Sequence, residues 1–194
     1  MSQNPLAFIA AQQQAAAAAA AANPVLYVPA SARDEIRAYN VLKIYAVCHP
    51  KSAASGTGKT NHWTLSFDVG NGQGVRLDIQ PNPLQTHTNG GMKAQVIVSR
   101  LNYVVTNNAE RHDSVSVTYS RPVSWYIDYL ASGGRFRYAF TSEGIGCRQW
   151  IRDTLKLLAD IGEVNGSDSE SARRALGRLW PDNRTAEPAA GTYF

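Results

Sequence analysis

The sequence predicts a single α+β domain, with strands in its first half and helices in its second. Apolar and polar residues alternate along residues 63–69 and again along 75–79, which is the two-residue period of a half-buried strand. After residue 122, apolar residues recur at helical spacing instead. A chain of 194 residues is long enough to bury one core, so we expect one domain with extensions at its ends.

Low-complexity sequence precedes the expected domain. Residues 1–35 are rich in Ala and Gln and contain an unbroken alanine run at 15–22, so they have no amphipathic face to bury. We expect a mobile extension over residues 1–35 and a folded domain over residues 36–180. Residues 181–194 are expected to form a C-terminal tail.

The expected strands are rich in β-branched and aromatic residues and lie between turn signals. The glycine-rich run at residues 70–74 separates two alternating segments, which is typical of a β-hairpin. In chain order, the expected strands cover residues 41–47, 63–69, 75–79, 94–105, 115–119 and 135–140.

Three helices are expected in the second half of the chain. The first covers residues 123–130 directly after a proline, which suits a first helical turn. The second follows Gly146, carries an apolar face and stops at Gly162. The third opens at Ser167 or Ser169, because serine is a favourable N-cap residue.

Composition argues against several classes of protein. The net charge of +4 is small and the basic residues are scattered, so nothing indicates a nucleic-acid partner. No apolar run approaches the roughly 18 residues that a membrane span requires, so we expect no integral membrane segment. Two cysteines do not make a disulfide framework, and no basic residue precedes Arg33 as a secretory signal would require. We therefore expect a cytoplasmic protein, and its oligomeric state stays open.

Two patterns that resemble cofactor sites do not satisfy the structural requirements of those sites. Residues 53–60 fit a relaxed Walker-type phosphate loop, but the following residues alternate as a strand where such a loop needs a helix. Cys48 and His49 are consecutive residues of a strand and point to opposite faces, and no zinc-ligand spacing accompanies them. We expect neither a cofactor nor a metal site.

Cys147 is the main candidate for a reactive group. It lies in the first turn of the second expected helix, directly after Gly144, Ile145 and Gly146. The unpaired N–H groups and partial positive charge of a helix N-terminus stabilise a thiolate, which is the reactive form of cysteine. The same N–H groups can hold the oxyanion of a tetrahedral intermediate. The alternative interpretation is a buried cysteine that acts as a small hydrophobic residue.

His62 is the candidate general base. It begins the first strand of the hairpin, from where it can reach a neighbouring helix terminus. Pairing the hairpin about its turn places it near Gln80 or Asn82, and Asp78 projects from the same face one pleat further along. Any of these three can orient the imidazole, and we rank Asp78 and Gln80 equal and Asn82 behind them. The alternative is a surface histidine at the end of a strand.

The segments that carry these residues resemble the lecithin:retinol acyltransferase and HRAS-like phospholipase family. Residues 62–66 are similar to the family's His-Trp-Ala-Leu-Tyr strand, and a glycine turn and a second strand ending at Pro81 follow as in the family. Residues 138–143 and 146–151 are similar to its Tyr-x-Leu-Thr-Ser-Glu-Asn-Cys-Glu-His-Phe-Val motif. The resemblance spans residues 40–160.

This resemblance implies a circularly permuted papain-like fold of the NlpC type. The antiparallel sheet would pack against the cysteine-bearing helix, and an acyl-thioester would form on Cys147. Three positions depart from the family pattern: its second-strand histidine falls at Asp78, its asparagine before the cysteine at Gly146, and its following histidine at Gln149. Two extra residues also separate Glu143 from the cysteine.

The residues and the resemblance together predict a soluble cysteine-dependent hydrolase or acyltransferase. Cys147 would attack a small-molecule acyl donor or a peptide, His62 would take its proton, and Asp78 or Gln80 would hold the imidazole. Two other functions stay open: a non-catalytic binding module on the same scaffold, and a peptidase or isopeptidase that acts on a protein tag.

Overall fold

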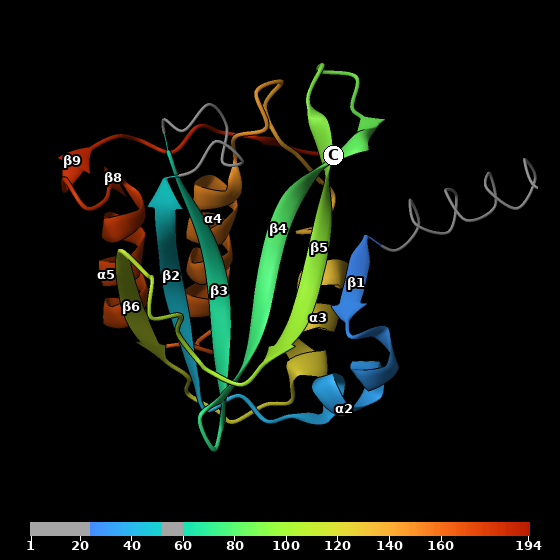
Figure 1. Ribbon diagram of the computed structural model, residues 1–194, viewed down its shortest axis with the longest axis vertical. Coiled ribbons are helices and arrows are strands. Elements are labelled where there is room, and N and C mark those ends of the chain that lie inside the picture. The colour runs from blue at the N-terminus through green and yellow to red at the C-terminus, as the bar shows by residue number, and fades with distance from the viewer. Residues whose placement is uncertain (1–23, 52–59) are drawn as a thin grey trace, which may run out of the picture.

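The computed structural model describes residues 24–51 and 60–194 (Figure 1). Most of the expected extension, residues 1–23, and nearly all of the Walker-type segment, residues 52–59, lie outside the described residues. The described part has the α+β architecture that the sequence predicts.

A mostly antiparallel sheet forms the centre of the fold. Its strand order is β10-β7-β5-β4-β3-β2-β6, and β1 joins β5 in parallel orientation. A separate two-stranded pair is formed by β8 and β9. The strands are β1 Val25–Val28, β2 Lys43–Lys51, β3 Asn61–Gly70, β4 Gln73–Thr86, β5 Met92–Leu101, β6 Arg111–Ser116, β7 Tyr138–Ala139, β8 Arg178–Leu179, β9 Arg184–Thr185 and β10 Thr192–Tyr193.

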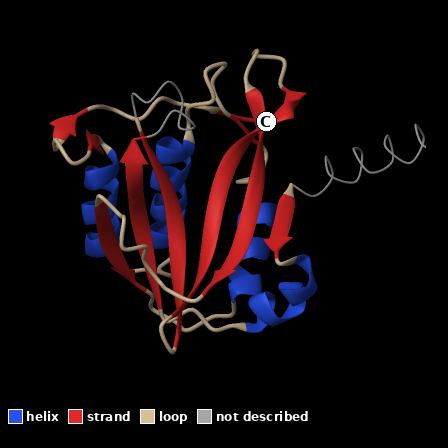
Figure 2. Ribbon diagram, in the orientation of Figure 1, coloured by secondary structure: helices blue, strands red, loops and turns tan. Residues whose placement is uncertain are grey.

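Four α-helices occur in the described residues, and a short 3-10 helix at Ala30–Ala32 precedes the first of them. They are α2 Arg33–Ala38, α3 Val123–Ser132, α4 Cys147–Asp160 and α5 Gly166–Leu176. Figure 2 shows α3, α4 and α5 on the far side of the sheet, which leaves the near side of the central strands without a covering helix. The main core therefore lies between this sheet and one layer of helices.

The alternating pattern of the hairpin forms this core. Trp63, Leu65 and Phe67 of β3 are fully buried, as are Val75, Leu77 and Ile79 of β4. The apolar face of α4 packs on the same side of the sheet, with Trp150, Ile151, Leu155 and Leu158 all fully buried. The apolar side chains that alternate along the strands and those that recur at helical spacing in residues 147–160 pack together in one core layer, as the sequence predicts.

The expected strands have different limits in the structure; β2 continues to Lys51 and β4 to Thr86, beyond the ends expected at 47 and 79. The strand expected at 94–105 ends at Leu101, because the chain then crosses the outer face of the sheet, where the Ser66 hydroxyl donates to the carbonyl of Val104. The strand expected at 135–140 is reduced to the two residues of β7, and that expected at 115–119 is shifted to β6.

The chain ends are more structured than the sequence indicates. Residues 25–28 were expected in the mobile extension, but they form β1 and pair with β5. The expected tail 181–194 contains β9 and β10, and β10 pairs with β7. For β1 and β10 the physical reason is the same: partners distant in the chain supply hydrogen bonds that such short strands do not reveal.

Asn61 ties the end of the chain to β3. Its side-chain amide donates to the carbonyl oxygens of His49 and Trp180, both at 3.0 Å, and its oxygen accepts from the Trp180 N–H at 2.8 Å. Asn61 is fully buried. We call residues 177–194 the C-terminal segment. Asn61, which directly precedes His62, therefore holds this segment close to His62.

We expect Asn61→Ala to lower the free energy of unfolding by about 2 kcal/mol, because it leaves buried backbone groups without partners. Chemical denaturation measures this change. Asn82→Ala is the control, because the side chain of Asn82 accepts only from the Leu84 N–H in the exposed end of β4, and it should change stability by less than about 0.5 kcal/mol. Equal effects of the two substitutions would contradict the anchoring role of Asn61.

Candidate functional site

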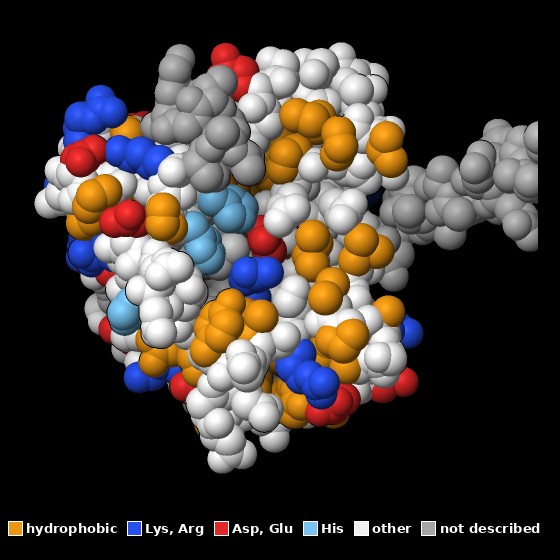
Figure 3. Space-filling view, viewed as in Figure 1, with side chains coloured by type: hydrophobic (Ala, Val, Ile, Leu, Met, Phe, Trp, Pro, Cys, Tyr) orange, Lys and Arg blue, Asp and Glu red, His pale blue; other side chains and the backbone are white. Residues whose placement is uncertain are grey.

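Cys147 and His62 line the same cavity. Its volume is about 360 Å³, and it lies where β2, β3 and β4 approach the start of α4. Figure 3 shows histidine side chains gathered on the face of the sheet that carries no helices, next to acidic and basic side chains. The residues that line the cavity are His49, Pro50, Thr60, Asn61, His62, Ile79, Gln80, Pro81, Phe140, Gly144, Ile145 and Cys147.

His62 and Cys147 lie at one cavity because β3 and β4 separate at the end of the sheet that carries His62. The paired register of the two strands ends at Leu65 and Leu77, although both strands continue (Figure 1). The start of α4 lies at this opening, and the backbone N–H of Trp63 on β3 helps to lower the pKa of the Cys147 thiol. Through this opening Cys147, at the start of α4, comes close to His62 on β3.

Glycine is required immediately before Cys147. A Cβ atom at Gly146 would lie 2.9 Å from the hydroxyl of Tyr138, and that hydroxyl donates to the Gly146 carbonyl at 3.0 Å. No side chain caps the N-terminus of α4, and its hydrogen-bond ladder begins with the bond from Trp150 N–H to the Gly146 carbonyl. The N–H groups of the first turn have no acceptor within the helix, so they are suited to bind an oxyanion.

Asp78 and Gln80 form a chain of hydrogen bonds that ends on His62. The imidazole Nε2 lies 2.8 Å from one carboxylate oxygen of Asp78, and the Gln80 amide donates to the other oxygen at 2.8 Å. Asp78 is only 4% exposed. Asp78 thus orients the histidine and Gln80 orients Asp78, which separates two candidates that the sequence ranks equal. Asn82 instead accepts the Leu84 N–H.

Electrostatics favour a charged pair of His62 and Cys147. Burial opposes a charge on His62, but its hydrogen bonds to Asp78 and Cys147 prevail and raise the pKa of the imidazole to about 10. Burial also opposes a thiolate at Cys147, but the hydrogen bonds from His62 and Trp63 prevail and lower the pKa of the thiol. Because Nε2 faces Asp78, the nitrogen that remains for the sulfur is Nδ1. The arrangement stabilises an imidazolium–thiolate pair.

Cys48, the other cysteine of the chain, has a thiol environment opposite to that of Cys147. It is fully buried in β2, and burial raises the pKa of its thiol. Neither cysteine forms a disulfide. The two thiols of the chain therefore differ in reactivity by position alone, since Cys147 has the helix start and the histidine while Cys48 has a closed apolar environment.

His49 is the site residue that sequence reasoning missed. Its ring stacks on His62 with the ring centroids 5.7 Å apart, and its Nε2 lies 3.0 Å from the Thr64 hydroxyl. Burial and the nearby charge of His62 lower the pKa of His49 to about 4, so it is neutral beside the cationic ring. His49 and His62 follow Cys48 and Trp63, the last regular pair of β2 and β3, and the pairing of these two strands was the information that the sequence did not supply.

The described residues contain neither a cluster of metal-ligating side chains nor a membrane-spanning helix. Among residues 24–51 and 60–194, no group of three or more His, Cys, Asp or Glu side chains is arranged to hold a metal ion. Within the same ranges, no helix has the length and apolar character needed to cross a membrane.

The reactivity of the two cysteines tests this site. We expect iodoacetamide to alkylate Cys147 rapidly at neutral pH and to leave Cys48 unmodified in the folded protein. Because the pKa of Cys147 is lowered, the rate should stay high below the ordinary thiol range and fall only as the pH drops through that lowered pKa. In His62→Ala, burial prevails and the midpoint should rise by about two pH units or more.

Peptide mapping by mass spectrometry assigns each adduct to one cysteine. His112→Ala, which removes an exposed histidine of β6, serves as the control and should leave the midpoint unchanged. A midpoint for Cys147 at or above that of free cysteine would contradict the charged pair.

Comparison with known proteins gives one match. No curated protein and no solved structure matches the chain. A family model described as "Domain of unknown function (DUF7770)" matches residues 44–194. The matched range contains His62, Asp78, Gln80 and Cys147 together with the C-terminal segment, and it begins after β1 and α2. Since the match covers well over half of the sequence, the chain belongs to the DUF7770 family.

Proposed function

We propose that this protein is a cysteine-dependent hydrolase or acyltransferase that works through an acyl-thioester on Cys147. One observation carries the proposal: His62, which is hydrogen-bonded to Asp78 and through it to Gln80, lines the same cavity as Cys147, and each of His62 and Cys147 favours the charged form of the other. A buried thiolate, a cation beside it and a carboxylate that orients the cation are the parts that thiol-dependent acyl transfer requires.

The first half of the reaction forms the thioester. The Cys147 thiolate attacks the carbonyl carbon of the acyl donor, and the electron pair of the C=O bond moves to the oxygen. The N–H groups at the start of α4 hold this oxyanion. When the tetrahedral intermediate collapses, the bond to the leaving group breaks and the His62 imidazolium donates its proton to that group. The products are the acyl-thioester on Cys147 and neutral His62.

The second half regenerates the enzyme. Neutral His62 removes a proton from water or from an alcohol or amine acceptor as that molecule attacks the thioester carbonyl. Collapse of the second tetrahedral intermediate breaks the C–S bond and restores the thiolate beside the imidazolium. Water as acceptor makes the protein a hydrolase, and another acceptor makes it an acyltransferase.

The cavity suits an uncharged acyl group. Apart from the two histidines and the thiol, none of its described lining side chains is ionisable. Ile79, Pro81, Phe140 and Ile145 give one part of the wall an apolar character, while Thr60, Asn61 and Gln80 contribute polar groups. Ester, thioester and peptide donors all present such an acyl group, so the proposal includes them all.

The proposal extends to the architecture. A circularly permuted papain-like arrangement would place the histidine strand before the cysteine helix in the chain, as β3 and α4 are ordered here. The short motifs around His62 and Cys147 support a relation to the lecithin:retinol acyltransferase and NlpC-type proteins. Asp78 would then take the place of that family's second histidine, as a carboxylate that serves the same imidazole.

Intact-mass measurements after incubation with a panel of acyl esters, thioesters and peptides test the proposal. We expect a stable or transient acyl adduct on Cys147, absent in Cys147→Ala and retained in Cys48→Ala. His62→Ala should lower the acylation rate by about 100-fold, because it removes the base that generates the thiolate. Gln80→Ala should lower it by about fivefold, because it removes one hydrogen bond to the buried carboxylate of Asp78.

Three results would each contradict or narrow the proposal. No adduct with any donor, together with slow alkylation of Cys147, would favour a non-catalytic binding module on this scaffold. Acylation that persists in His62→Ala at the rate of the unaltered protein would remove the histidine from the mechanism. Adducts formed only from peptides of a protein tag would identify the protein as a peptidase or isopeptidase.

A further inference from the structure

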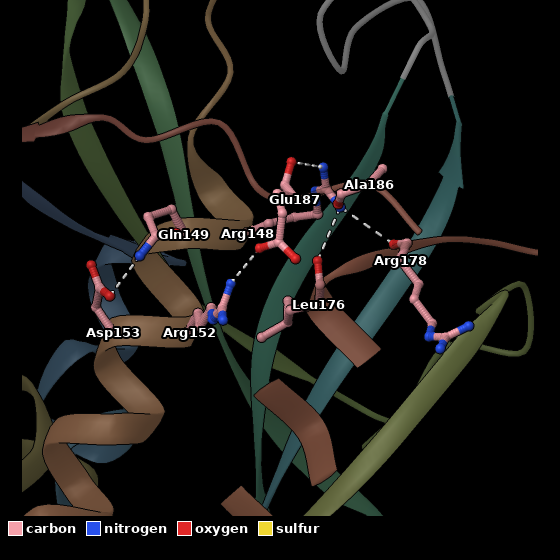
Figure 4. Close-up of polar contacts among 8 residues, drawn as sticks. All are labelled: Arg148, Gln149, Arg152, Asp153, Leu176, Arg178, Ala186 and Glu187. Atoms are coloured by element: carbon pink, nitrogen blue, oxygen red, sulfur yellow. Dashed lines mark hydrogen bonds and ion pairs between the residues drawn. The ribbon is translucent and has the colours of Figure 1, made fainter. Parts of the chain in front are cut away.

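Arg148, the residue after the proposed nucleophile, is a buried cation. It is 5% exposed, although it lies in the first turn of α4. Figure 4 shows its guanidinium surrounded by backbone carbonyl groups from the end of α5 and the C-terminal segment. It donates to four of them: Leu176 at 3.0 Å, Arg178 at 3.4 Å, Ala186 at 2.8 Å and Glu187 at 3.3 Å.

These carbonyl groups satisfy donors but carry no net charge. No carboxylate forms an ion pair with Arg148 in the described part of the chain; the carboxylate of Glu187 pairs instead with Arg152 at 2.8 Å. A buried charge without a counter-ion is costly. The anion available to Arg148 within the site is the thiolate of Cys147, its neighbour in the chain.

We infer that Arg148 is a positioning residue of the proposed site, which fixes the C-terminal segment across the start of α4 and stabilises the Cys147 thiolate with its positive charge. This inference rests on the proposed function. Asp78 pairs with His62 at 2.8 Å, His62 favours the thiolate of Cys147, and Arg148 follows Cys147 in the first turn of α4.

The C-terminal segment links both halves of the site through this contact. Its Trp180 is held by Asn61, the residue before His62. Its Gly191 donates to the hydroxyl of Tyr138, which in turn donates to the carbonyl of Gly146, the residue before Cys147. With Arg148 as the third anchor, the segment joins the strand of the histidine to the helix of the cysteine.

The test compares the pH dependence of alkylation with the protection of the segment in full-length variants. We expect Arg148→Gln to raise the alkylation midpoint of Cys147 by about half to one pH unit, which lowers the rate about threefold to tenfold at a pH below the midpoint. Arg148→Lys keeps the charge, so the alkylation midpoint should stay within about 0.3 pH units of that of the unaltered protein. Lysine cannot reach all four carbonyls, so amide exchange in residues 184–194 should accelerate.

Arg152→Gln is the matched control. It removes a contact between α4 and Glu187 of the C-terminal segment, one turn away from the nucleophile, and should leave the alkylation midpoint unchanged. The charged and titratable groups that act on Cys147 or Arg148 are intact in this control; they are His62, Cys48, Tyr138 and Glu187. Asp78 and His49, which act on His62, are intact as well.

The outcomes separate this inference from the proposed function. A low midpoint in the unaltered protein that does not move in a folded Arg148→Gln variant would overturn the role of Arg148 and leave the enzyme proposal intact. An ordinary thiol midpoint in the unaltered protein would overturn both. If Arg148→Gln does not fold, Arg148→Lys decides: unchanged exchange in residues 184–194, or a midpoint raised like that of free cysteine, would contradict the inference.

Discussion

The imidazolium–thiolate pair between His62 and Cys147 is the interaction on which the proposed site depends. Neither charge is stable alone in this environment, because burial opposes both of them. Asp78 makes the cation favourable, and the cation makes the thiolate favourable. The charges on Asp78, His62 and Cys147 therefore depend on one another, and removal of one of these side chains leaves a buried charge unpaired.

The fold supplies this pair through three local features. The separation of β3 and β4 beyond Leu65 and Leu77 opens the sheet where α4 begins. Gly146 permits close packing of the helix start against Tyr138, because any side chain there would collide with its ring. The C-terminal segment then connects β3 to the start of α4. Residues near the end of the chain therefore help to define a site whose reactive groups come earlier in the sequence.

Much of the fold was predictable from the sequence because its signals are local. The alternation at residues 63–69 and 75–79 and the glycine-rich turn between them identified the central hairpin, and the helical period after Gly146 identified α4. The limits of short strands were not predictable. The pairing of β1 with β5 and of β10 with β7 depends on partners far away in the chain, and two to four residues carry too little pattern to reveal them.

Sequence reasoning also indicated part of the arrangement at the candidate site. Helix-start chemistry identified Cys147, and hairpin register brought His62 near Asp78 and Gln80, but register by itself placed His62 opposite Gln80 rather than on Asp78. His49 and Arg148 were missed for one reason. Their roles depend on which distant backbone or ring lies next to them, and their residue types do not carry that information.

The protonation state of His62 tests the central claim most directly. Nitrogen NMR of the histidine-labelled protein, with the His62 signals assigned from His62→Gln, should show both ring nitrogens protonated at neutral pH and deprotonation near pH 10. In Cys147→Ala the midpoint should fall by about one to two pH units, because the thiolate no longer stabilises the cation. A His62 ring that is neutral at neutral pH, or a midpoint that does not respond to loss of the thiol, would contradict the charged pair.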